Sequence, residues 1–208
     1  MAWDRWIRTV EIEPATHGAE ASARERSVET LLRTGCRIFH LKCGDLGARQ
    51  AADAVGQLAP LVHRYDGVLD VHVAAGEFHE LAAAGADSIT FDAAAFYDVP
   101  AALARLRETG VSAGVAFGTW VPEDEVAANA SSADLVLCAG GADGAVQRVR
   151  RLTEVLPRSV TIQVEGEITF ENARSLYLAG ARALVTERTI FEREDLPRAY
   201  RRLVQALG

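Results

Sequence analysis

A histidine and a lysine stand two residues apart in the segment Ile38–Lys42. Side chains alternate along a β-strand, so a strand here would place His40 and Lys42 on the same side. Lys42 is the only lysine among the 208 residues, and the other 21 of the 22 basic residues are arginine. A desolvated lysine can act as a general base or attack a carbonyl carbon, and histidine binds metals or moves protons. This pair is therefore the first candidate for an active site.

Other polar residues fall at or just after the ends of apolar segments elsewhere in the chain. If the ends of these segments meet, His40, His72 and Glu165 form a set of donors that suits zinc, iron or manganese. The simpler alternative is that each histidine is only hydrogen bonded at the rim of a sheet. The other polar residues at or just after the ends of these apolar segments are Asp45, Asp70, Asp92, Gln163, Glu187 and Arg188.

Short segments rich in β-branched residues alternate with longer segments whose apolar residues recur at the helical period. In one of the longer segments, Val55, Leu58 and Val62 would share one face of a helix. The predicted strands are Thr9–Glu13, Ile38–Lys42, Leu69–Val73, Ser88–Asp92, Ser112–Phe117, Leu135–Cys138, Thr161–Glu165 and Ala183–Glu187.

Glycines separate the helical segments from the strands that follow them. Gly35, Gly85, Gly110 and Gly180 each stand at such a boundary. Glycine adopts the left-handed conformation that ends a helix at little cost, so we expect a helix end and a short loop at each one. Helix starts are also marked, because Thr169 is a suitable N-cap residue for the helix that would follow it.

Eight repeats of strand and helix in about 200 residues indicate a single (β/α)₈ TIM barrel spanning residues 1–208. A doubly wound open sheet is the rival fold. It usually carries a glycine-rich fingerprint after its first strand, and Pro14–Gly18 is not one. In a barrel the active site lies at the C-terminal ends of the strands, which is where His40 and Lys42 would be.

Composition limits the partners and the compartment. The formal charge of −7 argues against general binding to nucleic acids or anionic membranes. The three cysteines have no metal-binding spacing and are expected to be reduced thiols. No apolar run is long enough for a membrane span or a signal peptide, so we expect a cytoplasmic protein that acts on a small molecule. Trp3 and Trp6 could cover the barrel bottom or lie in the interface of a homo-oligomer.

The motifs at the strand ends resemble those of the ribulose-phosphate 3-epimerase family, a branch of the phosphate-binding TIM barrels. The similarity extends from Val28 to Leu207 and is divergent. The family's Leu-Asp-Val-His and Ala-Gly-Ala-Asp motifs are intact, whereas its other motifs are changed. The matching segments are His40–Asp45, Leu69–His72, Ala84–Asp87, Val164–Ile168 and Glu187–Phe191.

This resemblance implies one divalent metal held by two histidines and two aspartates. The two aspartates also shuttle the proton next to a ketose carbonyl. His40, His72 and Glu165 occupy three of the four positions, and Lys42 occupies the fourth. A protonated amine repels a divalent cation, so an ordinary metal site and an ordinary lysine should not coexist. The phosphate-binding glycines are also replaced, by Glu167 and by Glu187 with Arg188, which argues against an ordinary phosphate site.

Lys42 has three interpretations. It could be catalytic, with Glu165 as its acid–base partner, in an isomerase or epimerase that acts on a small sugar-like or sugar-phosphate-like carbonyl compound. Alternatively, Lys42 could be the Schiff-base nucleophile of an aldolase or lyase. It could be carbamylated and replace the missing anionic ligand. It could also fill the former metal site of a non-catalytic barrel that serves in binding or interaction.

The catalytic interpretation assigns further residues to the site. Related decarboxylases and hexulose-phosphate synthases carry Asp-x-Lys-x-x-Asp on strand three, and His40-x-Lys42-x-x-Asp45 resembles that motif on strand two. Asp45 is therefore a third catalytic candidate. The substrate would be held by His40, His72, Asp92, Arg188 and Gly166.

Overall fold

The structure is a computed structural model that describes residues 9–12, 18–44, 46–76, 78–138 and 144–208. Four residues singled out from the sequence lie outside these ranges: Trp3, Trp6, Glu13 and the catalytic candidate Asp45.

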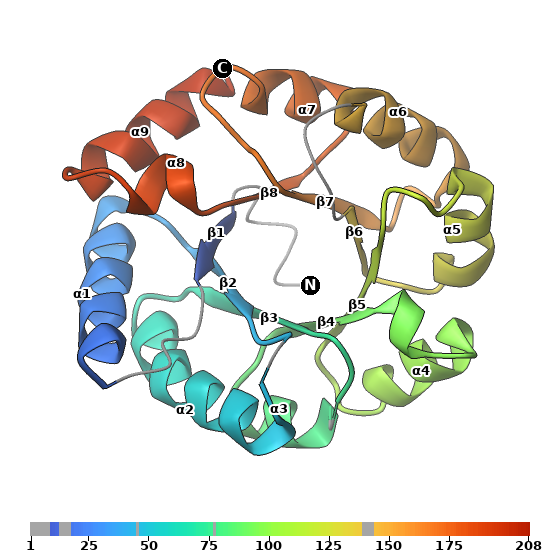
Figure 1. Cartoon of the computed structure of the whole chain (residues 1–208), viewed down its shortest axis with the longest axis horizontal. Coiled ribbons are helices and arrows are strands. Elements are labelled where there is room, and N and C mark those ends of the chain that lie inside the picture. The colour runs from blue at the N-terminus through green and yellow to red at the C-terminus, as the bar shows by residue number, and fades with distance from the viewer. Residues whose placement is uncertain (1–8, 13–17, 45, 77, 139–143) are drawn as a thin grey trace.

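Parallel strands form a closed barrel, and each strand pairs with its neighbours in chain order (Figure 1). Within the described residues the strands are β1 (Thr9–Ile12), β2 (Ile38–Lys42), β3 (Val68–Val73), β4 (Ser88–Asp92), β5 (Ser112–Phe117), β6 (Leu135–Cys138), β7 (Thr161–Glu165) and β8 (Ala183–Thr186). The pairing of Thr9 with Val185 and of Val10 with Thr186 joins β1 to β8 and closes the ring. The predicted (β/α)₈ barrel is therefore confirmed.

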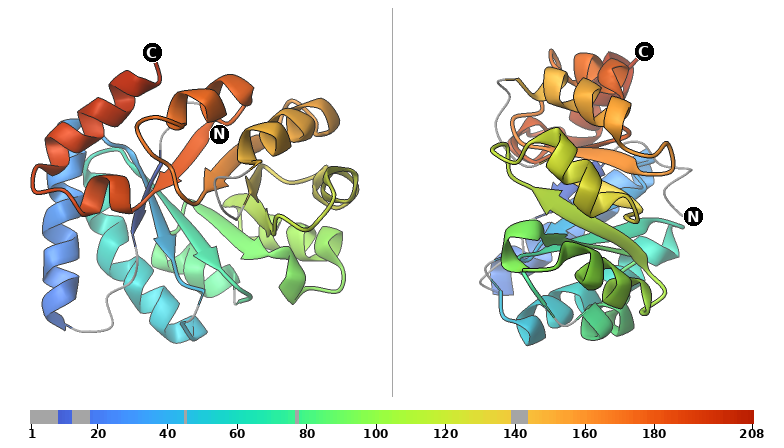
Figure 2. Two further views of the ribbon diagram at one scale, coloured as in Figure 1. Left: turned by 45° about the horizontal axis from the view of Figure 1, so that its top comes forward. Right: turned by 90° about the vertical axis from the view of Figure 1, so that its right-hand side faces the viewer.

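Helices surround the strands as an outer ring, which Figure 1 shows from one end and Figure 2 shows from two other directions. They are α1 (Gly18–Thr34), α2 (Ala48–Arg64), α3 (Phe78–Ala84), α4 (Val99–Arg107), α5 (Glu123–Ala130), α6 (Ala145–Val155), α7 (Ala173–Ala179), α8 (Arg188–Phe191) and α9 (Leu196–Ala206), with the 3₁₀ turn η2 (Ala93–Ala95). The last helix packs beside the first and completes the ring. None of the helices in the described ranges is long and apolar enough to cross a lipid bilayer.

The strands from β2 to β8 are buried on both faces, which explains their apolar composition. Outward-facing residues such as Phe39, Leu41 and Val71 pack against apolar faces of the helices, for example Val55 and Leu58 of α2. A second, smaller apolar cluster comprises Ile38, Val68, Ala116, Leu135, Leu137, Ala183 and Val185.

The interior of the barrel changes from apolar to polar along β2 and β3. On β2 the alternation of side chains places His40 and Lys42 on the same side as Ile38, which belongs to the inner cluster. The same change follows Val68 on β3, so the C-terminal half of the barrel interior is lined by groups that can do chemistry. These inward residues are His40, Lys42, Asp70, His72, Gln163 and Glu165.

The predicted strands agree with the observed ones to within one residue at each described end. The helix-ending glycines were also predicted correctly, because Gly35, Gly85, Gly110 and Gly180 all have positive φ. Two details were wrong. Thr169 accepts hydrogen bonds from the N–H groups of Glu171 and Asn172, but the helix α7 begins only at Ala173. The short helix α8 was not predicted, and it begins where the eighth strand had been extended to Glu187.

Candidate active site

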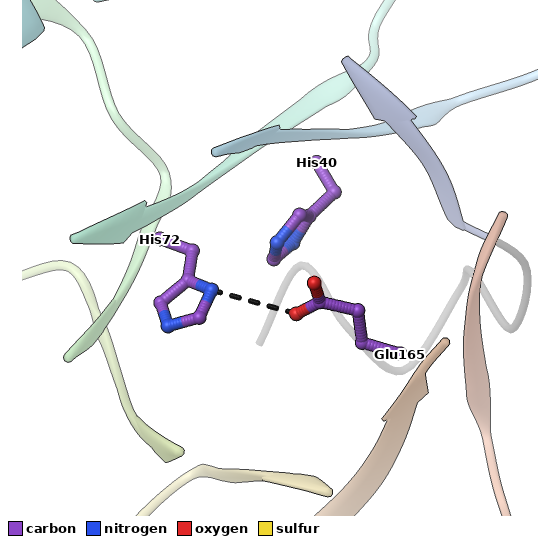
Figure 3. Close-up of side chains that lie close together, drawn as sticks. All are labelled: His40, His72 and Glu165. Carbon is purple, nitrogen blue, oxygen red and sulfur yellow. Dashed lines mark ion pairs between the residues drawn. The ribbon is translucent and has the colours of Figure 1, made fainter. Parts of the chain in front are cut away.

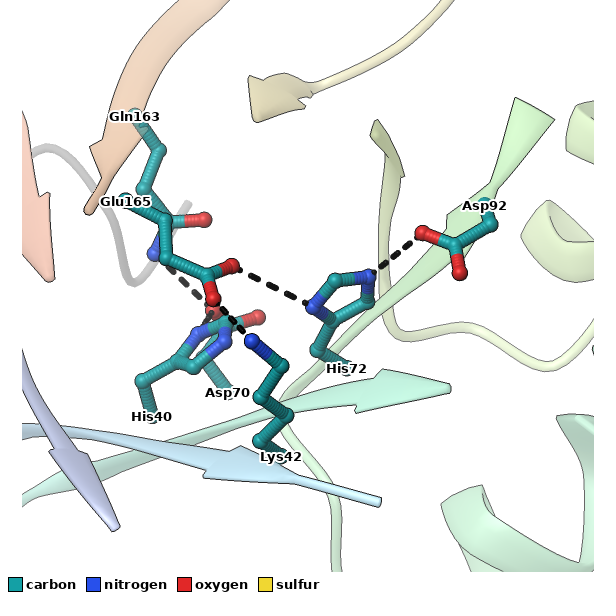
Figure 4. Close-up of polar contacts among 7 residues, drawn as sticks. All are labelled: His40, Lys42, Asp70, His72, Asp92, Gln163 and Glu165. Carbon is teal, nitrogen blue, oxygen red and sulfur yellow. Dashed lines mark hydrogen bonds and ion pairs between the residues drawn. The ribbon is translucent and has the colours of Figure 1, made fainter. Parts of the chain in front are cut away.

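Polar side chains from β2, β3, β4 and β7 meet at the C-terminal ends of the strands (Figure 4). Parallel pairing places Lys42 of β2 directly opposite His72 of β3, and the closed ring brings Glu165 of β7 across the barrel to both. The structure therefore unites His40, Lys42, His72 and Glu165, which were predicted from four separate positions in the sequence.

The deepest part of the site is a buried hydrogen-bonded group around Asp70. His40 Nδ1 donates to Asp70 Oδ2 at 2.7 Å, and the Gln163 side-chain amide donates to the same oxygen at 3.0 Å. All three residues are fully buried. A carboxylate accepts hydrogen bonds only, so this contact fixes the proton of a neutral His40 on Nδ1 and leaves Nε2 as a lone-pair donor.

Glu165 connects the two sides of the site. The Lys42 ammonium donates a hydrogen bond to Glu165 Oε1, and Glu165 Oε2 lies 3.6 Å from His72 Nδ1. The other ring nitrogen of His72, Nε2, donates to Asp92 Oδ1 at 2.9 Å. The result is a continuous chain of charged groups from Lys42 through Glu165 and His72 to Asp92 (Figure 4).

These contacts alter the acidity of the buried groups. Burial alone would raise the pKa of Glu165, but hydrogen bonding to His72 and Lys42 and the nearby positive charge lower its pKa to about 2. Burial alone would lower the pKa of His72, but Asp92 and Glu165 outweigh it and raise its pKa to about 9. Burial opposes ionisation of Asp70 too, yet its hydrogen bonds hold the pKa of that carboxyl below its usual range. The free site therefore holds an ionised Glu165 beside a protonated His72.

Three buried donor atoms converge in a way that fits a divalent metal ion (Figure 3). One nitrogen each from His40 and His72 and one carboxylate oxygen of Glu165 lie within 4.8 Å of one another. His40 Nε2, His72 Nδ1 and Glu165 Oε2 are buried, and no described residue offers any of them a hydrogen bond of normal length; the last two face each other at 3.6 Å. Unsatisfied buried polar atoms call for an explanation, and a bound cation is one.

The surroundings of these donors support the fit. Each histidine donates its other ring N–H to a carboxylate, which is the usual arrangement around histidines that bind a metal. With neutral imidazoles, the carboxylates of Asp70, Asp92 and Glu165 and the ammonium of Lys42 leave two negative charges, which one divalent ion would balance. Lys42 contacts Oε1 of Glu165, whereas Oε2 faces His72, so the amine and a metal ion would use different oxygens.

The remaining predicted site residues lie at different distances from this group. Asp92 belongs to it through His72. Gly166 follows β7 directly, is exposed and has a φ of 136°. Arg188 begins α8 with its side chain 80% exposed, and its guanidinium lies 3.8 Å from Glu192 rather than beside the four central residues. Its predicted substrate-binding role therefore stays a prediction.

Asp70 and Gln163 were noted in the sequence as inward-facing polar residues, but the role of positioning His40 was not assigned to them. The signal that could have found it is alternation, because Asp70 precedes His72 by two residues and Gln163 precedes Glu165 by two. A buried carboxylate needs a partner, and Asp70 pairs with His40 directly opposite it in the register of β2 and β3.

Several solved structures share this barrel. The chain superposes with a TM-score of 0.74 on orotidine 5'-phosphate decarboxylase from Pyrococcus horikoshii OT3, at 13% identity over 96% of this chain and 98% of that one. The score is 0.73 for 3-hexulose-6-phosphate synthase from Salmonella typhimurium, at 16% identity over 96% and 97%. It is 0.71 for thiamine phosphate pyrophosphorylase from Pyrococcus furiosus, at 17% identity over 97% and 98%. At such low identity these likenesses establish the fold alone.

Sequence comparison is more specific. No curated protein matches this chain. The sequence model of one family, however, matches residues 11–191, which include every strand end that contributes to the site. The two histidines and the acidic residue on β7 thus occur within a family match that covers most of the chain, and the chain belongs to the ribulose-phosphate 3 epimerase family.

Proposed function

We propose that this barrel is an isomerase or epimerase that moves a proton at the carbon next to the carbonyl group of a small sugar-like compound. The observation that carries the proposal is the contact between Lys42 and Glu165 at the C-terminal mouth of the barrel. The contact supports the proposal because it joins a proton donor on β2 to a proton acceptor on β7 at the end of the barrel where a substrate would enter. Membership of the epimerase family supports the same reaction class.

In the proposed reaction Glu165 removes the proton from the carbon next to the carbonyl. The electron pair of the broken C–H bond forms a double bond between the two carbons, and the carbonyl oxygen takes up the negative charge or a proton. Lys42 then returns a proton. If the proton goes to the same carbon from the opposite face, that carbon is inverted, and the oxygen gives up its charge or proton as the carbonyl re-forms. If it goes to the former carbonyl carbon, the hydroxyl on the first carbon loses its proton and becomes the new carbonyl, which isomerises the compound. An ammonium also stabilises negative charge that develops on the carbonyl oxygen.

Substrate entry would adjust Glu165 to this task. A carboxylate with a pKa of about 2 is a weak base, and a general base works best with a pKa near the working pH. A substrate that lies between Lys42 and Glu165 would break their contact. Loss of the hydrogen bond and charge of Lys42 would raise the pKa of Glu165, although His72 would still act to lower it. The pair is thus held inactive in the free protein and activated by the substrate.

His40, His72 and Glu165 would hold a divalent ion, with Asp70 and Asp92 orienting the two imidazoles. Such an ion would supply Lewis-acid polarisation of the substrate carbonyl. His72 would then have to be neutral, and Asp92 would keep its remaining ring proton on Nε2. The same residues would place the carbonyl of the substrate next to the proton-transfer pair.

The test is conversion of a panel of pentuloses, pentulose phosphates and smaller ketoses, followed by NMR. We expect the wild-type protein to interconvert at least one pair, and Lys42→Met and Glu165→Gln each to lower kcat by about 100-fold or more. Glu154→Gln, on the exposed face of α6, is the control and should retain full activity. Wild-type protein that converts no member of the panel, or Lys42→Met with unchanged kcat, would contradict the proposal.

A non-catalytic barrel is the second candidate function, because a contact between an ammonium and a carboxylate also suits a purely structural ion pair. Removing one partner of such a pair strongly destabilises a protein when the other stays buried. If Lys42→Met lowers the free energy of unfolding by several kcal/mol and the wild type has no turnover, this candidate is favoured. Trapping of a substrate on Lys42 by borohydride would instead favour a Schiff-base lyase.

A further inference from the structure

A pocket of about 470 Å³ opens beside the candidate active site, between the segments that follow β4 and β5. These two strands are paired neighbours in the barrel (Figure 1). The pocket reaches Asp92, whose Oδ1 accepts the hydrogen bond from His72. We call it the aromatic pocket, and its main lining side chains are Asp92, Phe96, Tyr97, Phe117, Trp120 and Glu125.

Trp120 is held in place although it is 79% exposed. Its indole lies directly on Gly118, where a Cβ atom would come within 2.3 Å of the ring. The backbone that carries the indole is fixed from α6, because the Arg148 guanidinium donates to the carbonyl oxygens of Gly118 and Thr119, both at 3.0 Å. An exposed tryptophan on a braced loop gains nothing for the stability of the core, so it is a prearranged surface for a ligand.

The opposite wall of the pocket is aromatic as well. Phe96 is fixed by Phe91 and Phe78, with ring centroids 4.7 and 6.1 Å away. The neighbouring Tyr97 is fully exposed, and with Trp120 and Leu178 it is one of the large apolar residues on the described surface. Two of these three exposed residues therefore flank a single pocket.

The charges of the pocket are all of one sign. Among the residues that the structure describes, Asp92 and Glu125 are the only charged ones in its lining, and no described lysine or arginine lines it. Aromatic faces are also electronegative, so rings and carboxylates together attract a cation and repel an anion. The lining therefore disfavours a phosphate or carboxylate group, even though the positive charges of His72 and Arg148 lie behind Asp92 and Gly118.

We propose that the aromatic pocket binds an organic cation through its alkylammonium group. Four aromatic residues, Phe96, Tyr97, Phe117 and Trp120, line the pocket, and Glu125 and Asp92 supply opposite charge. A ligand held there would lie next to Asp92 and His72, so a reacting substrate could extend from the pocket into the site of proton transfer. Binding to the pocket does not depend on the proposed reaction, and the two can fail separately.

Choline and neohexyl alcohol form a matched pair of probes, because they differ only in the replacement of the charged nitrogen by carbon. Calorimetric titration of the whole protein at constant ionic strength should give one saturable choline site, with neohexyl alcohol bound about tenfold more weakly. Equal or tighter binding of neohexyl alcohol would overturn the proposal, and so would the absence of saturable choline binding.

Variants locate the site. Trp120→Ala should weaken choline binding about tenfold, Glu125→Gln should weaken choline but not neohexyl alcohol, and Trp120→Phe should retain most of the affinity. Leu178→Ala removes an exposed apolar side chain on α7 and should change nothing. Circular dichroism and thermal unfolding identify variants that do not fold. Unchanged choline affinity in a folded Trp120→Ala protein would place the cation elsewhere and refute the assignment.

Discussion

At the scale of single residues, the site depends on carboxylates that hold the chemically active groups in one orientation. Asp70 is the clearest case, because it is fully buried and accepts hydrogen bonds from both His40 and Gln163. Glu165 divides its two oxygens between Lys42 and His72. The orientation of each imidazole is set by a carboxylate, Asp70 or Asp92, that is not one of the three converging donor residues His40, His72 and Glu165.

Asp70→Asn tests this positioning role. An amide can donate as well as accept, so the proton of His40 is no longer held on Nδ1, and we expect metal affinity to fall by 10- to 100-fold. Cobalt titration followed by visible absorption measures the affinity without requiring turnover. Asp53→Asn, on the exposed face of α2, is the control. Equal cobalt affinity in the wild type and Asp70→Asn would refute the role of Asp70.

At the scale of the elements, the barrel interior leaves little room where strands carry small residues. Gly114 on β5 faces Thr90 on β4, and a Cβ atom built on Gly114 would lie 2.2 Å from the Thr90 hydroxyl and 3.0 Å from Leu135. The glycine is thus required by close packing rather than by its φ angle, which is not in the left-handed region.

Gly114→Ala should therefore lower the free energy of unfolding by about 1–3 kcal/mol, because Thr90 and Leu135 must shift in a packed interior. Gly56→Ala is a matched control, since its Cβ meets nothing within 4 Å in the exposed face of α2. The Gly56→Ala change should raise the free energy of unfolding by about 0.5–1 kcal/mol, because alanine has the higher helix propensity. Urea denaturation measures both, and a neutral Gly114→Ala would show that the interior relaxes more easily than the distances imply.

The elements also show which parts of the structure a sequence can predict. Strands buried on both faces and glycines with positive φ leave local signals, so strand positions could be predicted closely. The helix α8 has only four residues and no apolar period, and it could not be predicted. Alternation correctly placed His40 beside Lys42, but the contact of Lys42 with Glu165 joins residues 123 positions apart and required the closed ring. The aromatic pocket depends on Phe96, Tyr97 and Trp120, which lie in loops that carry no periodicity.

At the scale of the whole molecule, the helix ring seals the thiols of the chain from solvent. Cys36, Cys43 and Cys138 are all buried. Burial raises the pKa of the Cys36 and Cys43 thiols to about 12 and that of Cys138 to about 11. Thiols with such values stay protonated at neutral pH and are poor nucleophiles.

At pH 8 we expect the urea-unfolded chain to react with three equivalents of a thiol reagent such as DTNB. Over the same time the folded protein should react with none. The pKa values in the fold lie above the unfolded value of about 8.5. The stabilisation by protonated thiols is then complete below pH 8.5 and is lost as the pH rises through 11–12. Rapid DTNB labelling of the folded protein would contradict the burial of these side chains.

The closed barrel brings Lys42 of β2 and Glu165 of β7 into contact, and the proposed function has this pair act on one substrate carbon. Exchange of the proton on that carbon in deuterated water, measured by NMR together with conversion, tests this claim most directly. Lys42→Met should retain exchange, because Glu165 can still remove the proton, while conversion falls by about 100-fold or more. Glu165→Gln should lose exchange and conversion together. Undiminished exchange in Glu165→Gln would contradict the role of Glu165 as the base and with it the account of this site.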